Sequence, residues 1–356
     1  MRPEDAEASP ATPSAKPEGI IFTQVPDHEL LRKIGSGSYG EVWLARSALG
    51  TYRAVKIVFR KSFAHERPFE REFSGIQKFE PISRSQEGLV HILQVGRNND
   101  AGYFYYVMEL ADDAAQPRPD HQPSTINHPP STYVPRTLAF DLSKRGRLPF
   151  DECLRIGLAL TSALAHLHKN GLVHRDIKPS NIIFVNGAPK LADIGLVTEA
   201  ADAPSYVGTE GFIPPEGPGT LQADIYSLGK VLYETATGKD RRDYPELPTK
   251  LDETVNQAEL IELNEIILTA CRADPRQRYQ SAEQMHADLV LLQGGRSIKQ
   301  LRKLERRLAL VTRIGIAAAA AALLAVGGYI GSIKQIQRAR RAEAEAAANA
   351  SVVSLK

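Results

Sequence analysis

The stretch "GLVHRDIKPSNIIF", residues 171–184, gathers many charged and polar side chains between two pairs of apolar residues. The apolar pairs, residues 172–173 and 182–183, are typical of short buried strands. A surface turn does not require so many different charged groups. The interval from Asp176 to Asn181 fits the spacing H-R-D-x-x-x-x-N, in which one loop presents a carboxylate and an amide together. The stretch therefore predicts a catalytic loop held between two buried strands.

A glycine-rich segment lies upstream, "IGSGSYGEVW" at residues 34–43, with glycines in the pattern G-x-G-x-x-G. Alone this pattern is weak, because dinucleotide-binding folds use the same glycines. Here an apolar strand enters at residues 30–34 and a second strand leaves at residues 41–45. A glycine turn between two strands argues against the strand–turn–helix unit that binds NAD. It favours a hairpin that folds over phosphate groups.

Lys56 lies in "AVKIV", embedded among apolar residues of the next strand. A half-buried ammonium requires a nearby anion. The following segment predicts a helix, because Phe69, Phe73 and Ile76 recur at helical spacing. On this helix Glu72 is the expected partner of Lys56, since Glu70 points about 160° away around the helix axis.

The periodicity of the chain changes along its length. Residues 30–110 read as short strands with one helix, whereas helical periodicity dominates from residue 138 onward. One face of a predicted helix carries Ile156, Leu160, Leu164 and Leu167. The pattern predicts an α+β chain, with a small sheet lobe followed by a larger helical lobe.

With these motifs in order, residues from about 30 to 293 resemble a eukaryotic-type protein kinase of the bacterial serine/threonine class. The resemblance implies a two-lobed kinase domain at 27–293, with ATP and Mg²⁺ as substrate and cofactor. It implies that Asp176 accepts or orients the substrate hydroxyl proton, that Lys178 contacts the γ-phosphate, and that Lys56, paired with Glu72, holds the α and β phosphates. Asn181 and Asp193 would hold magnesium. The implied nucleotide contacts are Ile34, Gly35, Ser36, Gly37, Ser38, Gly40, Val42, Ala54, Lys56, Met108, Glu109 and Ala111.

Two later segments are similar to family motifs but depart from them. In "LADIG" Ile194 stands where the family usually has Phe, and in "GTEGFIPPE" Pro214 replaces the usual Ala. Both segments keep the acidic residue that the motif requires. The resemblance further implies that residues 224–229 brace the catalytic loop and that Arg278 pairs with Glu216.

The resemblance also suggests the substrate hydroxyl. Lys178 after the catalytic Asp176, and Thr209 before the Pro-Pro-Glu segment, are similar to serine/threonine kinases, so protein Ser and Thr hydroxyls are the expected acceptors. Arg175 stands where many family members bind a phosphate on the activation segment, which implies autophosphorylation between Asp193 and Glu216. Two alternatives stay open. One is a pseudokinase scaffold, which would be expected to lack at least one of the residues Lys56, Asp176, Asn181 and Asp193. The other is a small-molecule kinase, which would not be expected to carry the Pro-Pro-Glu segment and its partner Arg278.

Two segments outside the strand and helix patterns differ in composition from the rest. Residues 1–26, rich in Pro, Ala and acidic residues, predict a disordered leader without a signal peptide. Residues 111–136 contain six prolines and few large aliphatic residues, so they predict a mobile insert.

Near the C-terminus, residues 314–333 run for twenty residues without a charge, enough to span about 30 Å of hydrocarbon. We predict a transmembrane helix there, the alternative being a buried soluble helix. Seven Lys and Arg residues lie in a basic juxtamembrane helix at 294–313, against four just after the span, which favours a cytoplasmic kinase domain. Residues 334–356 would then be a short extracytoplasmic tail. With the resemblance, this predicts a single-pass protein of the bacterial inner membrane.

Charge, cysteine spacing and small-residue motifs indicate which binding partners to expect. A formal net charge of +2, with Lys and Arg scattered along the chain, gives no nucleic-acid footprint. Cys153 and Cys271 are far apart and lack ligand spacing, so both are expected to be buried thiols. Gly327 and Gly331 form G-x-x-x-G within the span, and apolar residues at heptad spacing precede it, so a homodimer is a further expectation.

Overall fold

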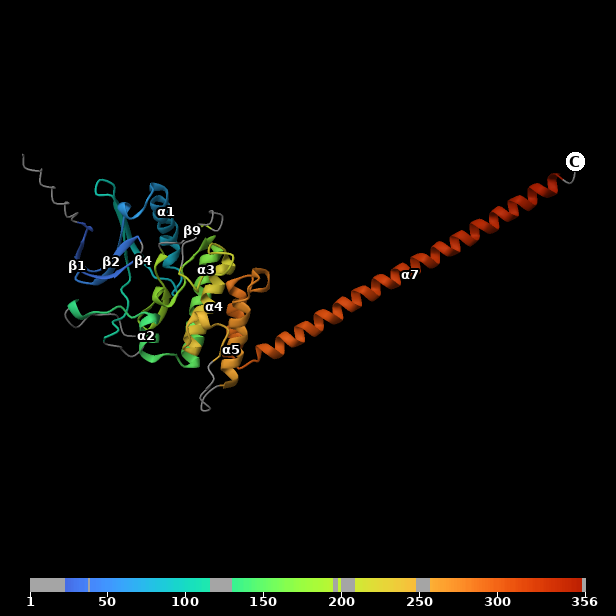
Figure 1. The fold of residues 1–356 in the computed structure, drawn as a ribbon. Coiled ribbons are helices and arrows are strands. Elements are labelled where there is room, and N and C mark those ends of the chain that lie inside the picture. The colour runs from blue at the N-terminus through green and yellow to red at the C-terminus, as the bar shows by residue number, and fades with distance from the viewer. Residues whose placement is uncertain are drawn as a thin grey trace, which may run out of the picture. The chain divides into compact units, whose positions relative to one another are not determined.

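The computed structural model of the protein describes residues 23–37, 39–115, 130–194, 198–199, 209–247 and 257–353. The chain divides into two compact units, residues 1–293 and residues 294–356. The first unit contains the two lobes that the sequence predicts, and the second is a single helix. The prediction of an α+β fold with a β-rich N-lobe and a helical C-lobe is confirmed (Figure 1).

The N-lobe is a five-stranded antiparallel sheet in the order β1-β2-β3-β5-β4. Strands β1 and β2 form the hairpin that carries the glycine turn, and the sheet and helix α1 lie together in Figure 1. The bounds are β1 His28–Ser36, β2 Gly40–Ser47, β3 Tyr52–Phe59, α1 Glu66–Ser83, β4 Ile92–Asn98 and β5 Tyr103–Met108.

Helix α1 packs on the sheet through the apolar face that its sequence predicts. Phe69 and Ile76 are buried, and the Phe69 and Phe73 rings lie 5.1 and 5.2 Å from the ring of Phe104 in β5. This packing fixes how the helix is rotated. The rotation agrees with the prediction that Glu72, not Glu70, faces the interior. Glu72 is buried, while Glu70 binds Arg97 at 2.5 Å.

The predicted leader at residues 1–26 is too long. Val25 is buried in the N-lobe core with Val55 and Ile57, and Gln24 exchanges two hydrogen bonds with the Tyr103 hydroxyl, at 3.1 and 2.9 Å. The prediction rested on the average composition of the segment, which did not reveal that Val25 packs on the sheet. The kinase domain therefore includes residues 23–26, and residues 1–22 lie outside the described part of the chain.

The C-lobe is a bundle of helices around α3, whose predicted core face, Ile156, Leu160, Leu164 and Leu167, is fully buried. Helices α3, α4 and α5 lie side by side in Figure 1. Cys153 and Cys271 are buried free thiols, as expected. The helix bounds are α2 Leu138–Arg145, α3 Phe150–Lys169, α4 Leu221–Thr237, α5 Gln257–Ala270 and α6 Ala282–Gln293.

Short strands in the C-lobe hold the opening motif of the sequence. Strand β6 pairs with β9, and β7 pairs with β8, so the catalytic loop runs between two small antiparallel ladders. Both apolar pairs of the motif lie in these strands, as predicted. The bounds are β6 Leu172–Val173, β7 Ile182–Val185, β8 Ala188–Leu191 and β9 Thr198–Glu199, with short 3-10 turns at Arg60–Ser62, Pro130–Thr132, Pro179–Asn181, Arg241–Asp243 and Pro275–Gln277.

The prediction that residues 111–136 are a mobile insert is wrong at both ends. Tyr133 is only 1% exposed, the Ala114 amide donates to the Val134 carbonyl at 2.8 Å, and the Arg136 amide donates to the Asp112 carbonyl at 2.8 Å. The two ends of the insert therefore form a short ladder with each other. Residues 116–129 lie outside the described residues.

The second unit is helix α7, Ile298–Val353. The helix contains a segment, Val311–Ala344, long and apolar enough to cross a membrane. The apolar side chains described in this segment include Leu323 and Leu324, which are 74% and 78% exposed. One continuous helix covers the predicted juxtamembrane segment, the span and most of the tail.

Candidate active site

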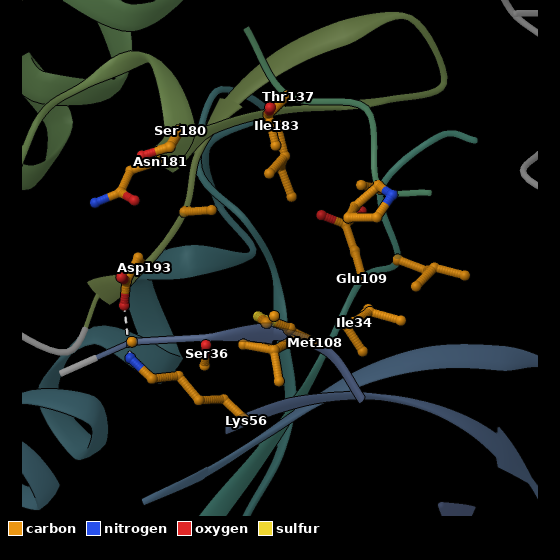
Figure 2. A pocket seen from close by; sticks show the side chains of 18 of the residues that line it. Ile34, Ser36, Lys56, Met108, Glu109, Thr137, Ser180, Asn181, Ile183 and Asp193 are labelled. Carbon is orange, nitrogen blue, oxygen red and sulfur yellow. Dashed lines mark hydrogen bonds and ion pairs between the residues drawn. The ribbon is translucent and has the colours of Figure 1, made fainter. Parts of the chain in front are cut away.

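A cavity of about 340 Å³ lies between the lobes and is lined by the glycine turn, β3, the segment after β5 and the catalytic loop. It collects nearly all of the predicted site residues. The cavity lining includes Ile34, Gly35, Ser36, Gly37, Val42, Ala54, Lys56, Glu72, Met108, Glu109, Ala111, Asp176, Lys178, Asn181 and Asp193. Residues between positions 34 and 193 thus meet around one cavity, and Figure 2 shows 18 of the residues that line it.

Two predicted nucleotide contacts are not among these residues. Ser38 lies outside the described residues, and Gly40 is absent from the cavity lining. A Cβ atom on Gly40 would come 2.2 Å from the Ile57 carbonyl oxygen, so glycine is required there for the pairing of β2 with β3. The third glycine of the motif is therefore required for the close approach of two backbones, and its contact with a nucleotide stays a prediction.

Lys56 bridges the two lobes. Its Nζ donates to Asp193 Oδ1 at 2.6 Å and lies 3.9 Å from Glu72 Oε1. Figure 2 shows the Lys56 and Asp193 side chains pointing toward each other across the cavity. The predicted partner Glu72 is therefore present, but the closer carboxylate is Asp193, which the sequence assigned to metal binding.

These charges shift one another's protonation. Burial opposes the charge on Lys56, but the Asp193 and Glu72 carboxylates outweigh it and raise the pKa of the lysine. The same ammonium lowers the pKa of Asp193. Burial raises the pKa of Glu72 to about 7, because Lys56 at 3.9 Å offsets only part of the desolvation. At neutral pH the site thus contains an ion pair with a second, readily protonated carboxyl group beside it.

Asp176 is held by three donors. Its Oδ2 accepts from Lys178 Nζ at 2.7 Å and from Asn181 Nδ2 at 2.9 Å, and its Oδ1 accepts from the Thr209 hydroxyl at 2.9 Å. Lys178 also donates to Thr209 at 2.9 Å. The loop residues and Thr209, 33 positions downstream of Asp176, form one connected network that orients the carboxylate.

Asp224 of α4 stabilises the catalytic loop through hydrogen bonds to its main chain. Its two oxygens accept from the main-chain N–H groups of His174 and Arg175, both at 2.8 Å, and from His168 Nε2 at 2.9 Å. Burial alone would raise the pKa of Asp224, but these hydrogen bonds and the neighbouring histidines lower it. Arg175 needs this support, because its φ of 71° is rare for a residue with a side chain. The predicted role of residues 224–229 is borne out.

The predicted magnesium ligands fit the chemistry of the ion. Both side-chain N–H donors of Asn181 serve Asp176, at its main-chain oxygen and at Oδ2, which leaves the amide oxygen of Asn181 available. Asp193 Oδ2 faces Gly37, where a Cβ atom would lie 4.0 Å away. Magnesium is typically bound by one or two protein oxygens, with waters and substrate phosphates completing its octahedron. The Asp193 carboxylate and the Asn181 amide oxygen therefore suffice in number and kind as protein ligands for the ion.

The other end of the cavity is apolar and carries open main-chain groups. Met108 and Ala54 face each other in the β3–β5 ladder, and Ile34 and Val42 complete the walls. In the described part of the chain, neither the Glu109 carbonyl oxygen nor the Ala111 amide makes a hydrogen bond. The Glu109 side chain instead binds Lys190 of β8 at 2.7 Å, which ties this segment to the C-lobe.

The segment after Asp193 is anchored at its far end. Arg278 forms a two-pronged ion pair with Glu216, through Nη1 to Oε1 and, at 2.9 Å, through Nη2 to Oε2. The side chain of Arg278 is fully buried and also donates to three main-chain carbonyls. The predicted pairing is confirmed. Ile194, in place of the usual Phe, is buried at 1% exposure.

Several residues of the cavity lining were not predicted. They include Tyr39 and Tyr106 from the N-lobe and Tyr133, Pro135 and Thr137 from the insert and the start of α2. The insert residues were missed because the proline content of the segment led to its assignment as mobile. A signal was present, since Tyr133 is the single aromatic residue between positions 111 and 136.

The fold and the arranged motifs define a protein kinase domain, and the protein kinase domain family matches residues 28–290. The chain belongs to this family, among the eukaryotic-type serine/threonine kinases of bacterial type. It is 30% identical over 289 residues to a probable serine/threonine-protein kinase of Clostridium perfringens, covering 74% of this chain and 38% of that relative. It is 29% identical to the serine/threonine-protein kinase PrkC of Bacillus subtilis, covering 74% and 40%, and 28% identical to PknB of Mycobacterium leprae, covering 75% and 43%. The chain thus spans about two fifths of the length of these curated relatives.

Proposed function

We propose that the protein is a membrane-anchored, non-specific serine/threonine protein kinase that transfers the γ-phosphate of ATP to Ser and Thr hydroxyls of proteins. The observation that carries the proposal is the convergence of Lys56, Asp176, Asn181 and Asp193 around one cavity beneath the glycine turn. A pseudokinase scaffold would be expected to lack one of these four side chains. Membership of a family of protein kinases agrees with protein substrates.

The two ends of the cavity differ in chemistry, which favours one orientation of ATP. The apolar walls near Met108 suit adenine, as do the Glu109 carbonyl and the Ala111 amide, which make no hydrogen bond within the described residues; the glycine turn with Lys56 suits the phosphates. When bound, magnesium would neutralise the charge that develops on the phosphates, with Asn181 and Asp193 as its protein ligands.

Phosphoryl transfer then depends on the network around Asp176. We infer that a substrate hydroxyl takes the position next to the Asp176 carboxylate and passes its proton to it as the new bond to the γ-phosphorus forms. The bond between the γ-phosphorus and the oxygen of ADP breaks, and Lys178 stabilises the charge on the transferred group. The Thr209 hydroxyl contacts both Asp176 and Lys178, and this contact supports the proposal that Ser and Thr hydroxyls are the acceptors.

The proposal includes regulation and location. Autophosphorylation between Asp193 and Glu216 is proposed with Thr198 and Ser205 as acceptors; Ser205 and the side chain of Thr198 lie outside the described residues. Residues 314–333 of α7 are proposed to cross the bacterial inner membrane once, with the kinase domain in the cytoplasm and residues 334–356 outside. Pairing of two chains through Gly327 and Gly331 is proposed for the same helix.

A phosphate-transfer assay with labelled ATP, magnesium and a generic Ser/Thr protein tests the function, using residues 1–293. Asp176→Asn should reduce transfer at least about 100-fold. Asp151→Asn, the same change at an exposed residue of α3, should leave the rate unchanged. A wild-type protein that binds ATP but transfers no phosphate would instead favour the scaffold. Phosphotyrosine as the product would contradict the assigned hydroxyl class.

A further inference from the structure

The ends of the insert form a defined structure beside the nucleotide cavity, here named the hinge clamp: residues 111–115 and 130–137. Within it, main-chain hydrogen bonds run from Ala114 to Val134 and from Arg136 to Asp112, both at 2.8 Å. The Asp113 carboxylate accepts from the Val134 amide at 3.0 Å. The clamp is therefore a closed two-stranded unit at the edge of the cavity.

The hinge clamp is fixed to the C-lobe. The Asp112 amide donates to the Phe184 carbonyl at 2.7 Å, and the Phe184 amide donates to the Arg136 carbonyl at 3.1 Å. The Asp112 carboxylate caps the β7–β8 turn by accepting from the amides of Asn186 and Gly187, both at 2.8 Å. Strand β7 follows the catalytic loop directly, so the clamp is anchored to the strand that bears the phosphate-transfer residues.

Tyr133 connects this anchor to the rest of the cavity. Its hydroxyl donates to the Ala111 carbonyl at 3.0 Å, and its own carbonyl accepts from Nη2 of Arg32 in β1. Burial raises the pKa of Tyr133, so its hydroxyl keeps the proton it donates. One residue thus contacts the segment where adenine is expected and the strand that leads into the glycine turn.

The position of Tyr133 also makes it part of the cavity wall. Tyr133, Pro135 and Thr137 line one side, and Ile34 and Gly35 of β1 line another. Because Arg32 belongs to the same strand as Ile34, the bond to Tyr133 constrains how far these two sides separate. A buried side chain with 1% exposure has little freedom to move independently.

We propose that Tyr133 is a positioning residue for the adenine nucleotide: the hinge clamp holds the Ala111 segment and β1 at the spacing that receives the base. The idea rests on the proposed function, since it assumes ATP in this cavity. Its effect is expected at the adenine end, because in the described part of the chain the hydrogen bonds of Tyr133 go to Ala111 and Arg32 and not to Lys56 or Asp176.

The test uses the full-length chain in detergent with Mg²⁺, and measures binding of ADP and of adenosine by calorimetry. Tyr133→Phe keeps the ring and removes the bond to the Ala111 carbonyl. It should weaken binding of both ligands by about tenfold, the same factor for each, since a buried acceptor loses its donor. The KM for ATP should rise by a similar factor, while kcat and the KM for the protein substrate stay within about twofold.

The matched control is Tyr233→Phe. It removes a buried tyrosine hydroxyl that donates to a main-chain carbonyl, that of Glu246 at 2.6 Å, in a helix away from the cavity lining. Its nucleotide affinity should equal that of the wild type. Equal affinity in Tyr133→Phe would overturn the proposal, as would a loss for ADP with none for adenosine. If the wild-type chain bound neither ligand, the proposed function would fall as well, and this outcome is distinct from the others.

Discussion

The Lys56 ammonium lies 2.6 Å from the Asp193 carboxylate, although 137 residues separate the two in the chain. The pair joins the sheet of the N-lobe to the loop that follows β8, and Glu72 stands behind it at 3.9 Å. With Mg²⁺ and ATP present, both partners are expected to hold the nucleotide instead. The pair therefore compensates the charge of the buried Lys56 ammonium, whereas the Asp193 side chain is 38% exposed.

Removal of either member should abolish activity without unfolding the protein. Lys56→Met and Asp193→Asn remove contacts to phosphate and metal, and each should lower autophosphorylation below about 10% of wild type. Thermal unfolding should remain a single cooperative transition in both variants. Clear activity in the Asp193 variant would count against its assignment as a metal ligand.

Glu72 should make stability depend on pH near neutrality. Burial raises its pKa from 4.5 to about 7 in the folded protein, so the folded state binds the proton more tightly than the unfolded state. The stability contributed by this group is fully present below the unfolded pKa and is lost as pH rises through 7. The decline should be on the order of 3 kcal/mol between pH 4.5 and 8.

Glu72→Gln provides the comparison, because it cannot titrate. Urea unfolding of both proteins from pH 4.5 to 8 should show the free energy of the wild type falling relative to that of the variant as pH rises. Parallel curves would show that Glu72 stays ionised throughout, held by Lys56 more strongly than the geometry suggests.

The pair between Glu216 and Arg278 should be a major contributor to C-lobe stability. Glu216→Ala leaves a fully buried guanidinium with main-chain acceptors only, and should cost about 3 kcal/mol in the free energy of unfolding. Arg276→Ala, which breaks an exposed ion pair with Asp274 in the same segment, is the control. Chemical denaturation of the two variants measures the contrast; equal effects would contradict the role of the buried pair.

The activation segment should carry the regulatory phosphate. Arg175 immediately precedes Asp176, and a phosphate of about −1.5 to −2 charge on Thr198 or Ser205 could form charge-assisted hydrogen bonds with it. Thr198→Ala with Ser205→Ala should slow transfer to an added substrate, and Arg175→Ala should slow it comparably. Combining the changes should add no further loss, since they interrupt one interaction.

Mass spectrometry of the active enzyme provides the direct measurement for this switch. Arg175 is 6% exposed, and its guanidinium lies beside Gly219, where a Cβ atom would come 3.1 Å from Nη2. A phosphate on the activation segment must therefore reach the buried Arg175 guanidinium to activate the enzyme. Full activity without phosphate anywhere from residue 194 to 215 would rule out the mechanism.

The full chain should behave as an integral membrane protein. The apolar segment of α7 is held in a bilayer by burial that salt does not weaken, so carbonate or high salt should fail to extract it. A chain ending at residue 293 should be soluble under the same conditions. Gly331→Ile should reduce crosslinking between full-length chains while leaving membrane insertion unchanged, if the glycine pair brings two helices together. Extraction of the full chain by carbonate would contradict the anchor.

Much of the site could be predicted because its information is local. The rotation of α1 follows from the spacing of Phe69, Phe73 and Ile76, and this spacing selects Glu72 over Glu70 as the inward carboxylate. Helical and strand periods are properties of adjacent residues, so they survive without knowledge of the fold. The motif spacing around Asp176 is local in the same sense.

The tertiary structure decided which distant groups meet. The 2.6 Å contact of Lys56 with Asp193, the clash that requires glycine at position 40, and the burial of Val25 all depend on how strands far apart in sequence approach each other. Tyr133 is the clearest case. The composition of residues 111–136 indicates a segment too polar to fold alone, and this holds for an isolated peptide. The folded lobes supply Arg32 and Phe184 as partners, and their preformed surface offsets the entropy that the segment itself could not overcome.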